Sequence, residues 1–553
     1  MIKEEISDYK KNKSIMVAGL TLLLFMQLVA TIVFNLTQLQ SHMGFDTSWS
    51  YLKAILIWRE KSIVSDVWAD TTAHLLDGSI VPASVLYGIT GNIYLSYGLC
   101  NSFFVLILIL VMWDVSKNLG LDLKGRLVTL NLMLCPFLCN GFSPRNLGYF
   151  MVLLCGDCLY NVRTILFLIS LDVILLMIGR RADDPADKTK RSDVKIRILA
   201  AIAFLLAFVC GMSSGIYVFL TCFIPLMLYS FVMAIIKNDA KLIISREMLF
   251  PFSGGVCVCL GKAFQSVFMP LPTAGDEKTW TTIADIWKNT GAVFQGFMKL
   301  MNILPVTRTV TVFSVEGLLK ILALGTALLI LTAFLWTLNK SRGILVKKDY
   351  DEPVFVPIVV IIWHIIVFSL FNVQYGSPVF EERYLICAFI SVMLLVGFCI
   401  SSVDTKQLFT NLLMWGLLLS LLFTDIASDG IYVMLTNKDW HMEEVAGKAD
   451  ELDAGIVIFC GDDLIETGRA MRVYDYGRIY KCVDSDGNIV HWGDYKYYDD
   501  LSFYDGKIMY AVSREDSELA PGILEGAVYS GTCEQYDIYI KCQKEGKDED
   551  TYN

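Results

Sequence analysis

The chain has 553 residues, of which 55% are hydrophobic, and its mean hydropathy is +0.53. These values exclude an ordinary soluble globular protein and indicate a chain that crosses a membrane many times. The net charge of −10 is unevenly spread: residues 428–553 hold 27 acidic and 12 basic residues, whereas residues 1–427 hold 29 acidic and 34 basic ones. No basic stripe with interleaved aromatic residues is evident, which argues against nucleic acid as a partner.

Eleven apolar runs are long enough to cross a bilayer, since a hydrocarbon core of about 30 Å needs roughly 20 apolar residues. The first run follows a basic N-terminal flank and is too long for the core of a signal peptide, so we expect a retained helix. The predicted spans are 14–36, 92–113, 126–142, 160–179, 197–213, 215–236, 247–269, 314–338, 354–371, 384–401 and 407–427.

The distribution of lysine and arginine predicts the orientation. With the N-terminus in the cytoplasm, the inner segments hold 22 of these residues and the outer loops hold ten. This is the bias expected of cytoplasmic segments. An odd number of spans then places residues 428–553 outside the cytoplasm, as a domain separate from the membrane region 1–427.

The first outer loop, residues 37–91, contains two amphipathic stretches that predict helices lying on the membrane surface. Trp49, Leu52, Ile55 and Leu56 share one helical face, and Val64, Val67, Trp68 and Leu75 share another. Asp46 precedes the first stretch, where its carboxylate could accept a proton from a sugar or lipid hydroxyl. It could equally cap the N-terminus of that helix, and the two roles are compatible.

Arg383 begins the tenth span at its outer end, between Glu382 and Tyr384. A guanidinium at this depth can bind a phosphate or pyrophosphate bidentately while a lipid tail lies between helices. The alternative is structural, because Arg383 could pair with a neighbouring glutamate or anchor the helix at the membrane surface.

Several other ionisable residues lie within or close to apolar segments, where charge is costly and functional roles are common. Asp157 and Lys262 fall toward the outer face on this topology, on the same side as Asp46. Asp172 lies deeper, and His364 is near the middle of a span, where we expect a structural hydrogen bond. The chain has no phosphate-binding loop of the GxxxxGK[ST] type, which argues against ATP-driven transport.

The C-terminal part is expected to form a small α/β domain. Residues 443–452 predict a helix, residues 454–461 a buried strand, and residues 472–476 and 536–540 further alternating strands. Four cysteines in this part could form two disulfides if the domain is extracytoplasmic, with a pairing that the sequence leaves open. They are Cys460, Cys482, Cys533 and Cys542.

Taken together, these features resemble the GT-C superfamily of membrane glycosyltransferases, in particular bacterial relatives of protein O-mannosyltransferases and aminoarabinose transferases. The resemblance rests on short motifs spread over nearly the whole chain and on the external α/β tail. The motifs are Asp46 in the first outer loop, Gly88-Ile89-Thr90-Gly91-Asn92-Ile93-Tyr94 entering span two, Pro136 late in span three, Asp157 before span four, and Glu382-Arg383-Tyr384-Leu385 at a late span.

The resemblance implies transfer of a sugar from a polyprenyl-phosphate donor to a lipid, glycan or protein acceptor of a bacterial cell envelope, on the outer face and with inversion. It makes Asp46 the general base and Arg383 the phosphate contact. Asp157 would be a supporting polar group, and the other substrate-binding candidates are Glu382, Tyr384, Lys262 and His42.

One departure affects the expected chemistry. Many members of the family have an Asp-Glu pair in the first loop, whereas Asp46 is followed by Thr47. A requirement for a divalent metal therefore stays open, and the alternative acids in this loop are Asp66, Asp70 and Asp77.

Two other function classes also remain: a transporter or flippase of lipid-linked envelope precursors, and an envelope scaffold whose external domain binds partners.

Overall fold

A computed structural model describes most of the chain, which divides into two compact units. The described residues are 2–43, 45–65, 68, 74, 76–135, 152–156, 159–182, 189–213, 215–270, 279–301, 303–304, 309–346, 353–372, 382–402, 408–426, 441–461, 464–488, 504–514 and 522–542. The first unit comprises Met1–Gln38, Thr72–Ser79 and Tyr97–Thr436, and the second comprises Leu39–Thr71, Ile80–Ser96 and Asn437–Asn553.

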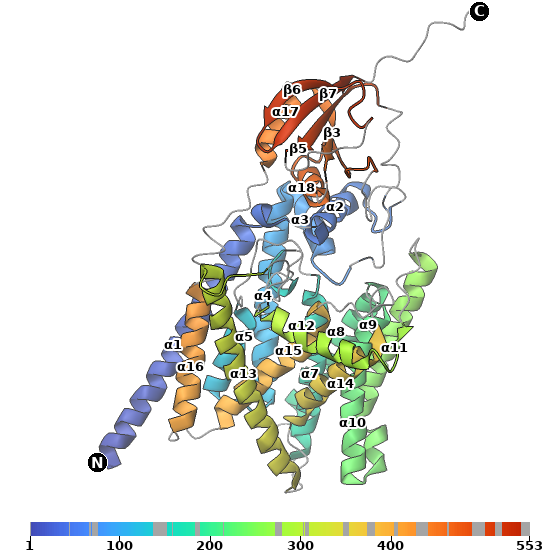
Figure 1. Ribbon diagram of the computed structural model, residues 1–553. Helices are drawn as coiled ribbons and strands as arrows, with labels where there is room; N and C mark the ends of the chain where they lie inside the picture. Colours follow the sequence, from blue (N-terminus) through green and yellow to red (C-terminus); the bar gives the residue numbers. More distant parts are fainter. Residues whose placement is uncertain are drawn as a thin grey trace, which may run out of the picture. The chain divides into compact units, whose positions relative to one another are not determined.

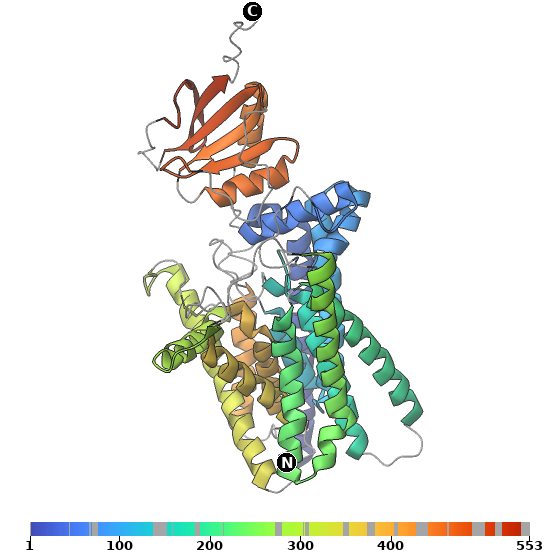
Figure 2. The ribbon, with the colours of Figure 1, turned by 90° about the vertical axis from the view of Figure 1, so that its right-hand side faces the viewer.

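The first unit is helical (Figures 1 and 2). Its long helices are α1 (Ile2–Thr37), α4 (Ile93–Asn118, from Tyr97 on), α5 (Leu123–Leu134), α7 (Asn161–Ala182), α8 (Thr189–Ser213), α10 (Ile224–Lys237), α11 (Arg246–Phe268), α12 (Ile286–Leu300), α13 (Val315–Val346), α14 (Phe355–Leu370), α15 (Ile386–Ser402) and α16 (Leu408–Asp425). The short elements are α9 (Ile216–Val218), η2 (Phe219–Phe223), η3 (Ala240–Ile244), η4 (Glu382–Leu385) and the paired strands β1 (Thr279–Trp280) and β2 (Phe371–Asn372).

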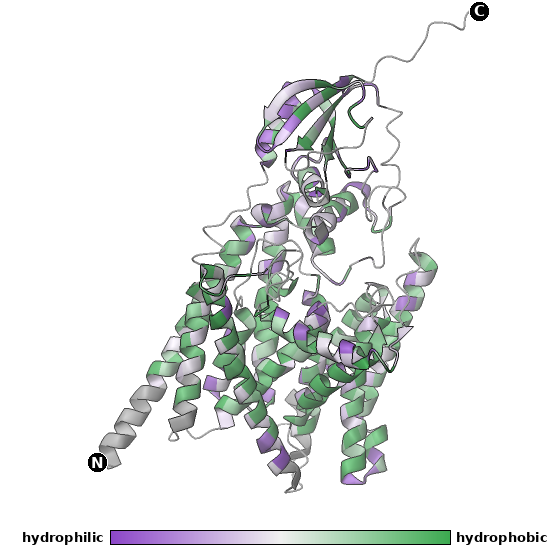
Figure 3. Ribbon diagram, in the orientation of Figure 1, coloured by the Kyte–Doolittle hydropathy of each residue, from purple (hydrophilic) through white to green (hydrophobic). Residues whose placement is uncertain are grey.

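Hydropathy and length make this a multi-pass membrane protein, as the sequence predicted. Among the described residues, eight segments are long and apolar enough to span a bilayer, and shorter apolar helices at Ile80–Thr90, Phe355–Leu370 and Trp415–Thr424 add to them. Figure 3 shows the long helices mostly in the hydrophobic colour. The predicted third span corresponds to α5 up to Leu134, and its remainder, with Pro136, lies outside the described residues.

Small residues allow neighbouring helices to pack with their backbones in contact, as is common in membrane proteins. A Cβ atom on Gly261 of α11 would lie 2.1 Å from the carbonyl oxygen of Phe208 in α8. A Cβ atom on Gly211 of α8 would lie 2.2 Å from the carbonyl oxygen of Val258. Only glycine fits at these two points, so the α8–α11 contact is fixed by sequence.

The second unit combines residues between the first two long apolar helices with the C-terminal α/β domain. Its elements are η1 (Gln40–His42), α2 (Phe45–Glu60), α3 (Ile80–Thr90), α17 (Met442–Glu451), β3 (Ala454–Cys460), α18 (Ile465–Tyr474), β4 (Ile479–Val483), β5 (Lys507–Ser513), β6 (Val528–Cys533) and β7 (Tyr536–Cys542). The sheet order is β4-β3-β5-β7-β6, in which β3 is parallel to β4 and β5 while β7 is antiparallel to β5 and β6. The parallel pair β3–β4 is connected by a helix, as such pairs require.

The C-terminal domain confirms three predicted elements and corrects another. The helix at 443–452 and the strand at 454–461 correspond to α17 and β3, and the strand at 536–540 lies in β7. The strand predicted at 472–476 is wrong, because Arg472 to Tyr474 form the last turn of α18. This helix packs against both β4 and α2, contacts that the local alternation of residues in the sequence does not reveal.

Helix α2 also differs from the expectation in its surroundings. Its apolar residues Trp49, Leu52 and Ile55 are buried, and α2 contacts α3 and α18. Trp68, a residue of the second predicted stretch, packs against Trp49 with ring centroids 5.6 Å apart. Protein, rather than the bilayer surface, therefore covers the apolar face of this helix.

The four C-terminal cysteines are all present as thiols. Cys533 lies beside the turn between β6 and β7, whereas Cys542 ends β7 at the far end of that hairpin. Cys460 and Cys482 lie on adjacent parallel strands, where Cys482 is the register partner of Phe459. The structure therefore contains neither of the two disulfides that the sequence left open.

Candidate active site

A small pocket in the first unit contains two arginines. It lies among α7, the α9–η2 segment, η4 and the first turn of α15, and the cavity volume is about 10 Å³, room for about one water molecule. Its lining residues are Tyr160, Arg163, Thr164, Tyr217, Val218, Thr221, Cys222, Arg383, Tyr384, Ile386 and Cys387. Two guanidinium groups beside tyrosine hydroxyls form a surface suited to an anion.

Arg163 is held in this pocket by a buried ion pair. Its Nε donates to Asp77 Oδ2 at 2.5 Å and its Nη2 donates to Asp77 Oδ1 at 3.3 Å. The hydroxyl of Ser213 donates to the same carboxylate at 2.5 Å. The side chain of Asp77 is 0% exposed and that of Arg163 is 11% exposed. Asp77 is therefore a counter-ion in the described structure, which argues against its alternative role as a catalytic acid.

A second buried polar network fixes the segment that carries Asp77. The hydroxyl of Ser79 donates to Asn101 Oδ1 at 2.8 Å and accepts from Asn161 Nδ2 at 3.1 Å. Asn101 in turn donates to the carbonyl oxygen of Gly156 at 2.9 Å. These bonds tie residues 76–79 to α4 and α7, so Asp77 is held opposite the arginine in the first turn of α7.

Aromatic contacts hold the short helix η4, which carries Arg383. The hydroxyl of Tyr217 donates to the carbonyl oxygen of Tyr384 at 3.1 Å, and their ring centroids are 5.3 Å apart. Tyr384 also stacks on Phe368 of α14 at 6.1 Å. The Arg163 guanidinium lies 4.4 Å from the ring of Tyr160 and 5.9 Å from that of Tyr217, within cation–π range. The two arginines are thus linked through tyrosines.

One wall of the pocket is a π-helical turn, η2, between α9 and α10. Thr221 and Cys222 of this turn line the pocket, and Tyr217 and Val218 precede it. The hydroxyl of Thr221 bonds the carbonyl oxygen of Tyr217 at 3.0 Å. Such single turns are frequent at functional sites, because they change the direction of side chains within a continuous helix.

The residues predicted from sequence lie in the first unit, in the second unit, or outside the described residues. Arg383 and Tyr384 line the pocket, and Glu382 is buried beside them in η4. Lys262 is in α11, where its Nζ donates to Gln265 Oε1 at 2.5 Å.

Asp46 and His42 belong to the second unit. Asp46 is half-buried in the first turn of α2, one residue inside the helix rather than at its cap, and its backbone carbonyl accepts a bond from Ser50. His42 is buried in η1. Asp157, Asp66 and Asp70 lie outside the described residues.

The sequence did not single out Arg163, Tyr160 or Tyr217. Arg163 falls inside the predicted span 160–179, and it lies in the first turn of α7. An arginine at the start of a mostly apolar span needs a counter-ion, and that is the signal that could have identified it. Its partner is 86 residues away along the chain, so the pairing could not be read from spacing.

Two other buried ionisable residues are structural. Asp172 accepts a bond from Asn118 at 2.5 Å and lies 3.4 Å from Lys195. His364 Nδ1 bonds the backbone carbonyl oxygen of Val360 at 2.8 Å, as expected for a structural hydrogen bond in the middle of a span.

A larger cavity, about 750 Å³, lies at the amino ends of β3, β4 and β5 in the second unit. Four aspartates and two cations line it. Arg478 is committed to Asp450, to Asp475 and to the carbonyl oxygen of Ala454. Burial, and then the neighbouring Asp475, raise the pKa of Tyr480 above its usual value. The acidic lining disfavours a phosphate, so the smaller arginine-lined pocket is the better candidate for a phosphate-linked substrate.

Apolar spans, a helical membrane unit and a small mixed sheet define a polytopic membrane protein, as expected from the sequence. The fold is similar to that of ArnT, an aminoarabinose transferase, from Cupriavidus metallidurans. A crystal structure of ArnT in the apo state aligns with a TM-score of 0.58 and 11% identity, over 95% of this chain and 98% of that one. A crystal structure of ArnT bound to undecaprenyl phosphate aligns with a TM-score of 0.53 and 12% identity, over 94% and 97% of the two chains. No protein-family model matches the sequence, and no curated protein matches it.

Proposed function

We propose that this chain is a membrane glycosyltransferase that moves a sugar from a polyprenyl-phosphate donor to a lipid, glycan or protein acceptor of the cell envelope. The observation that carries the proposal is the pocket containing Arg163 and Arg383 in a fold similar to ArnT. One of the similar structures is bound to undecaprenyl phosphate, a ligand with the chemistry that such a pocket accepts. The transfer needs no nucleotide site, because the leaving group is itself a lipid phosphate.

The two arginines have different roles in this proposal. The charge of Arg163 is balanced by Asp77, and the described bonds use two of its five N–H donors. Arg383, which lines the pocket, is the proposed contact to the leaving phosphate, and Arg163 contributes remaining donors from a fixed position. Since the cavity has room for about one water molecule, side chains of η4 and α9 must shift when a phosphate enters.

Asp46 is the proposed general base, a role that rests on the resemblance and on its half-buried place in the first turn of α2. Removal of the acceptor proton by Asp46, with attack on the anomeric carbon opposite the leaving phosphate, would invert the configuration there. Glu382, Tyr384, Lys262, His42 and Asp157 remain proposed substrate-binding residues.

The proposed orientation follows from the positive-inside bias. The N-terminus is cytoplasmic, and residues 428–553 form an extracytoplasmic domain that follows the membrane region 1–427. Transfer then takes place on the outer face of a bacterial cell membrane, where lipid-linked sugars and envelope acceptors are both accessible.

The test is to incubate the purified protein with a panel of polyprenyl-phosphate sugars and to measure release of the polyprenyl phosphate and transfer of the sugar. Asp46→Asn should lower the rate about 10²–10⁴-fold, the usual contribution of a general base. Asp114→Asn, in an ion pair with Lys195 of α8, is the matched control and should keep full activity.

Arg383→Lys keeps the charge but loses the bidentate geometry, so it should weaken donor binding. Full activity in Asp46→Asn would remove this residue from the mechanism. Movement of the lipid-linked sugar across proteoliposomes, with no change in its covalent state, would instead establish the transporter alternative.

A further inference from the structure

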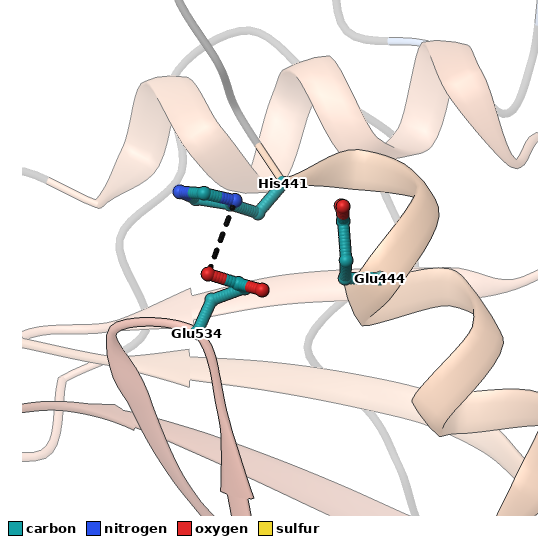
Figure 4. Close-up of side chains that lie close together, drawn as sticks. All are labelled: His441, Glu444 and Glu534. Carbon is teal, nitrogen blue, oxygen red and sulfur yellow. Dashed lines mark ion pairs between the residues drawn. The ribbon is translucent and has the colours of Figure 1, made fainter.

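A histidine and two glutamates come together at one edge of the C-terminal sheet (Figure 4). His441 precedes α17, Glu444 is in the first turn of that helix, and Glu534 is in the turn between β6 and β7. One potential ligand atom from each residue lies within 4.8 Å of the other two. The three residues therefore join two elements that are about 90 positions apart along the chain.

The spacing between the His441 and Glu534 ligand atoms matches a metal centre. His441 Nδ1 lies 3.4 Å from Glu534 Oε2. Ligand atoms at about 2.0–2.1 Å from a tetrahedral zinc ion are separated by about 3.4 Å, because the tetrahedral angle fixes that edge. The distance is longer than the usual 2.7–3.2 Å of an N–H···O hydrogen bond.

The backbone on both sides directs the side chains to this point. His441 has φ 48° and Glu534 has φ 51°, so both adopt the left-handed conformation that non-glycine residues rarely use. In Figure 4 the imidazole and the Glu534 carboxylate face each other, and the Glu444 carboxylate lies beside them. Helix α17 and strand β6 are also in contact.

The surrounding charge favours a cation. Glu443 and Glu444 are both in the first turn of α17, and Glu534 adds a third carboxylate. The nearest lysine on this helix, Lys448, is paired with Glu451, its Nζ lying 2.9 Å from Oε2. An imidazole with carboxylates suits zinc and similar transition metals, whereas magnesium and calcium prefer oxygen ligands alone.

We propose that His441, Glu444 and Glu534 bind a divalent transition-metal ion of the zinc class, which links the start of α17 to the β6–β7 turn. Three protein ligands leave the fourth position for water. Because the linked elements are far apart in sequence and lie within the α/β domain, the ion stabilises that domain.

The experiment uses the full-length protein, purified with a chelator and then dialysed free of it. Zinc affinity is measured by competition with a fluorescent chelator, at free zinc up to about 10 µM, and thermal unfolding is followed with and without zinc. The wild type should bind one equivalent of zinc. His441→Ala and Glu534→Gln should each lower the affinity for zinc at least about 10-fold. Glu525→Gln, which removes an exposed carboxylate elsewhere in the domain, should bind zinc as the wild type does.

Cobalt serves as a second probe, because thiolate ligands produce an intense charge-transfer absorption that nitrogen and oxygen ligands lack. The wild type should give a cobalt spectrum without that absorption. If His441→Ala disturbs folding, His441→Gln replaces it in the experiment and should give no such spectrum. The proposal is overturned if the wild type binds no zinc, if all variants bind it equally, or if cobalt reports thiolate ligands. Equal binding of magnesium or calcium would also overturn it.

Discussion

The ion pair between Asp77 and Arg163 gives a quantitative test of the candidate pocket. Replacing Asp77 by Asn removes the charge that faces a guanidinium whose side chain is only 11% exposed. Breaking a buried pair from one side costs about 3–5 kcal/mol, since the remaining charge stays in a medium that solvates it poorly. The hydroxyl of Ser213, which donates to the same carboxylate, loses part of its bond as well.

The double variant Asp77→Asn with Arg163→Met removes both charges and should recover much of this loss. The coupling free energy in the double-mutant cycle should reach about 2–3 kcal/mol, the upper part of the range for residues in contact. The assay is unfolding of the purified protein in mixed micelles of increasing denaturing detergent, followed by tryptophan fluorescence.

Asp114→Asn is the matched control, because Asp114 is 47% exposed and pairs with Lys195 at 3.0 Å in the same unit. An exposed pair of this kind contributes about 1 kcal/mol at most. The reasoning would be refuted if Asp77→Asn were no less stable than this control, or if the effects of the two pocket substitutions simply added.

Further predictions concern packing, thiol reactivity and acid stability. Gly261→Leu should destabilise the membrane unit by about 1–3 kcal/mol or more, because the backbone of α8 occupies the space of its Cβ; Gly325→Leu on α13, with no atom within 4 Å, should be close to wild type in the same unfolding assay. Burial raises the pKa of Cys460 to about 12, so a maleimide at pH 8 should label the exposed Cys542 and leave Cys460 unmodified until the protein unfolds, as mass spectrometry would show. Hydrogen bonds from a neighbouring asparagine hold the pKa of Asp484 below its ordinary value near 3.8. The stabilising contribution of this carboxylate is therefore present at neutral pH and lost as the pH falls through that lowered value. In acid unfolding, the free energy of unfolding of Asp484→Ala should differ from that of the wild type above that pH but not below it.

The length of the apolar runs predicted the membrane helices well, because a bilayer imposes one length and one composition on every span. The arginine at the start of η4 was found because a charge at a span boundary stands out against apolar neighbours. The C-terminal strand β3 was also clear from its unbroken run of β-branched and aromatic residues.

The remaining errors have a common physical cause in tertiary contacts. Residues 472–476 alternate as a strand would, yet they end a helix that packs against both β4 and α2. Asp77 was one of several loop acids until the fold placed Arg163 against it. The unit to which Asp46 belongs combines residues 39–71 and 80–96 with the C-terminal domain, a grouping that no local pattern in the sequence indicates.

The π-helical turn at Phe219–Phe223 has a consequence for evolutionary comparison. Such a turn holds one residue more than an α-helical turn, so side chains on its two sides are offset by about 100° relative to a uniform helix. A descendant that lost one residue here would keep its apolar helix but rotate Thr221 and Cys222 relative to α10. Gapless alignment of distant relatives across this point would therefore equate residues that face different directions, and a one-residue deletion would be a direct route to altered specificity.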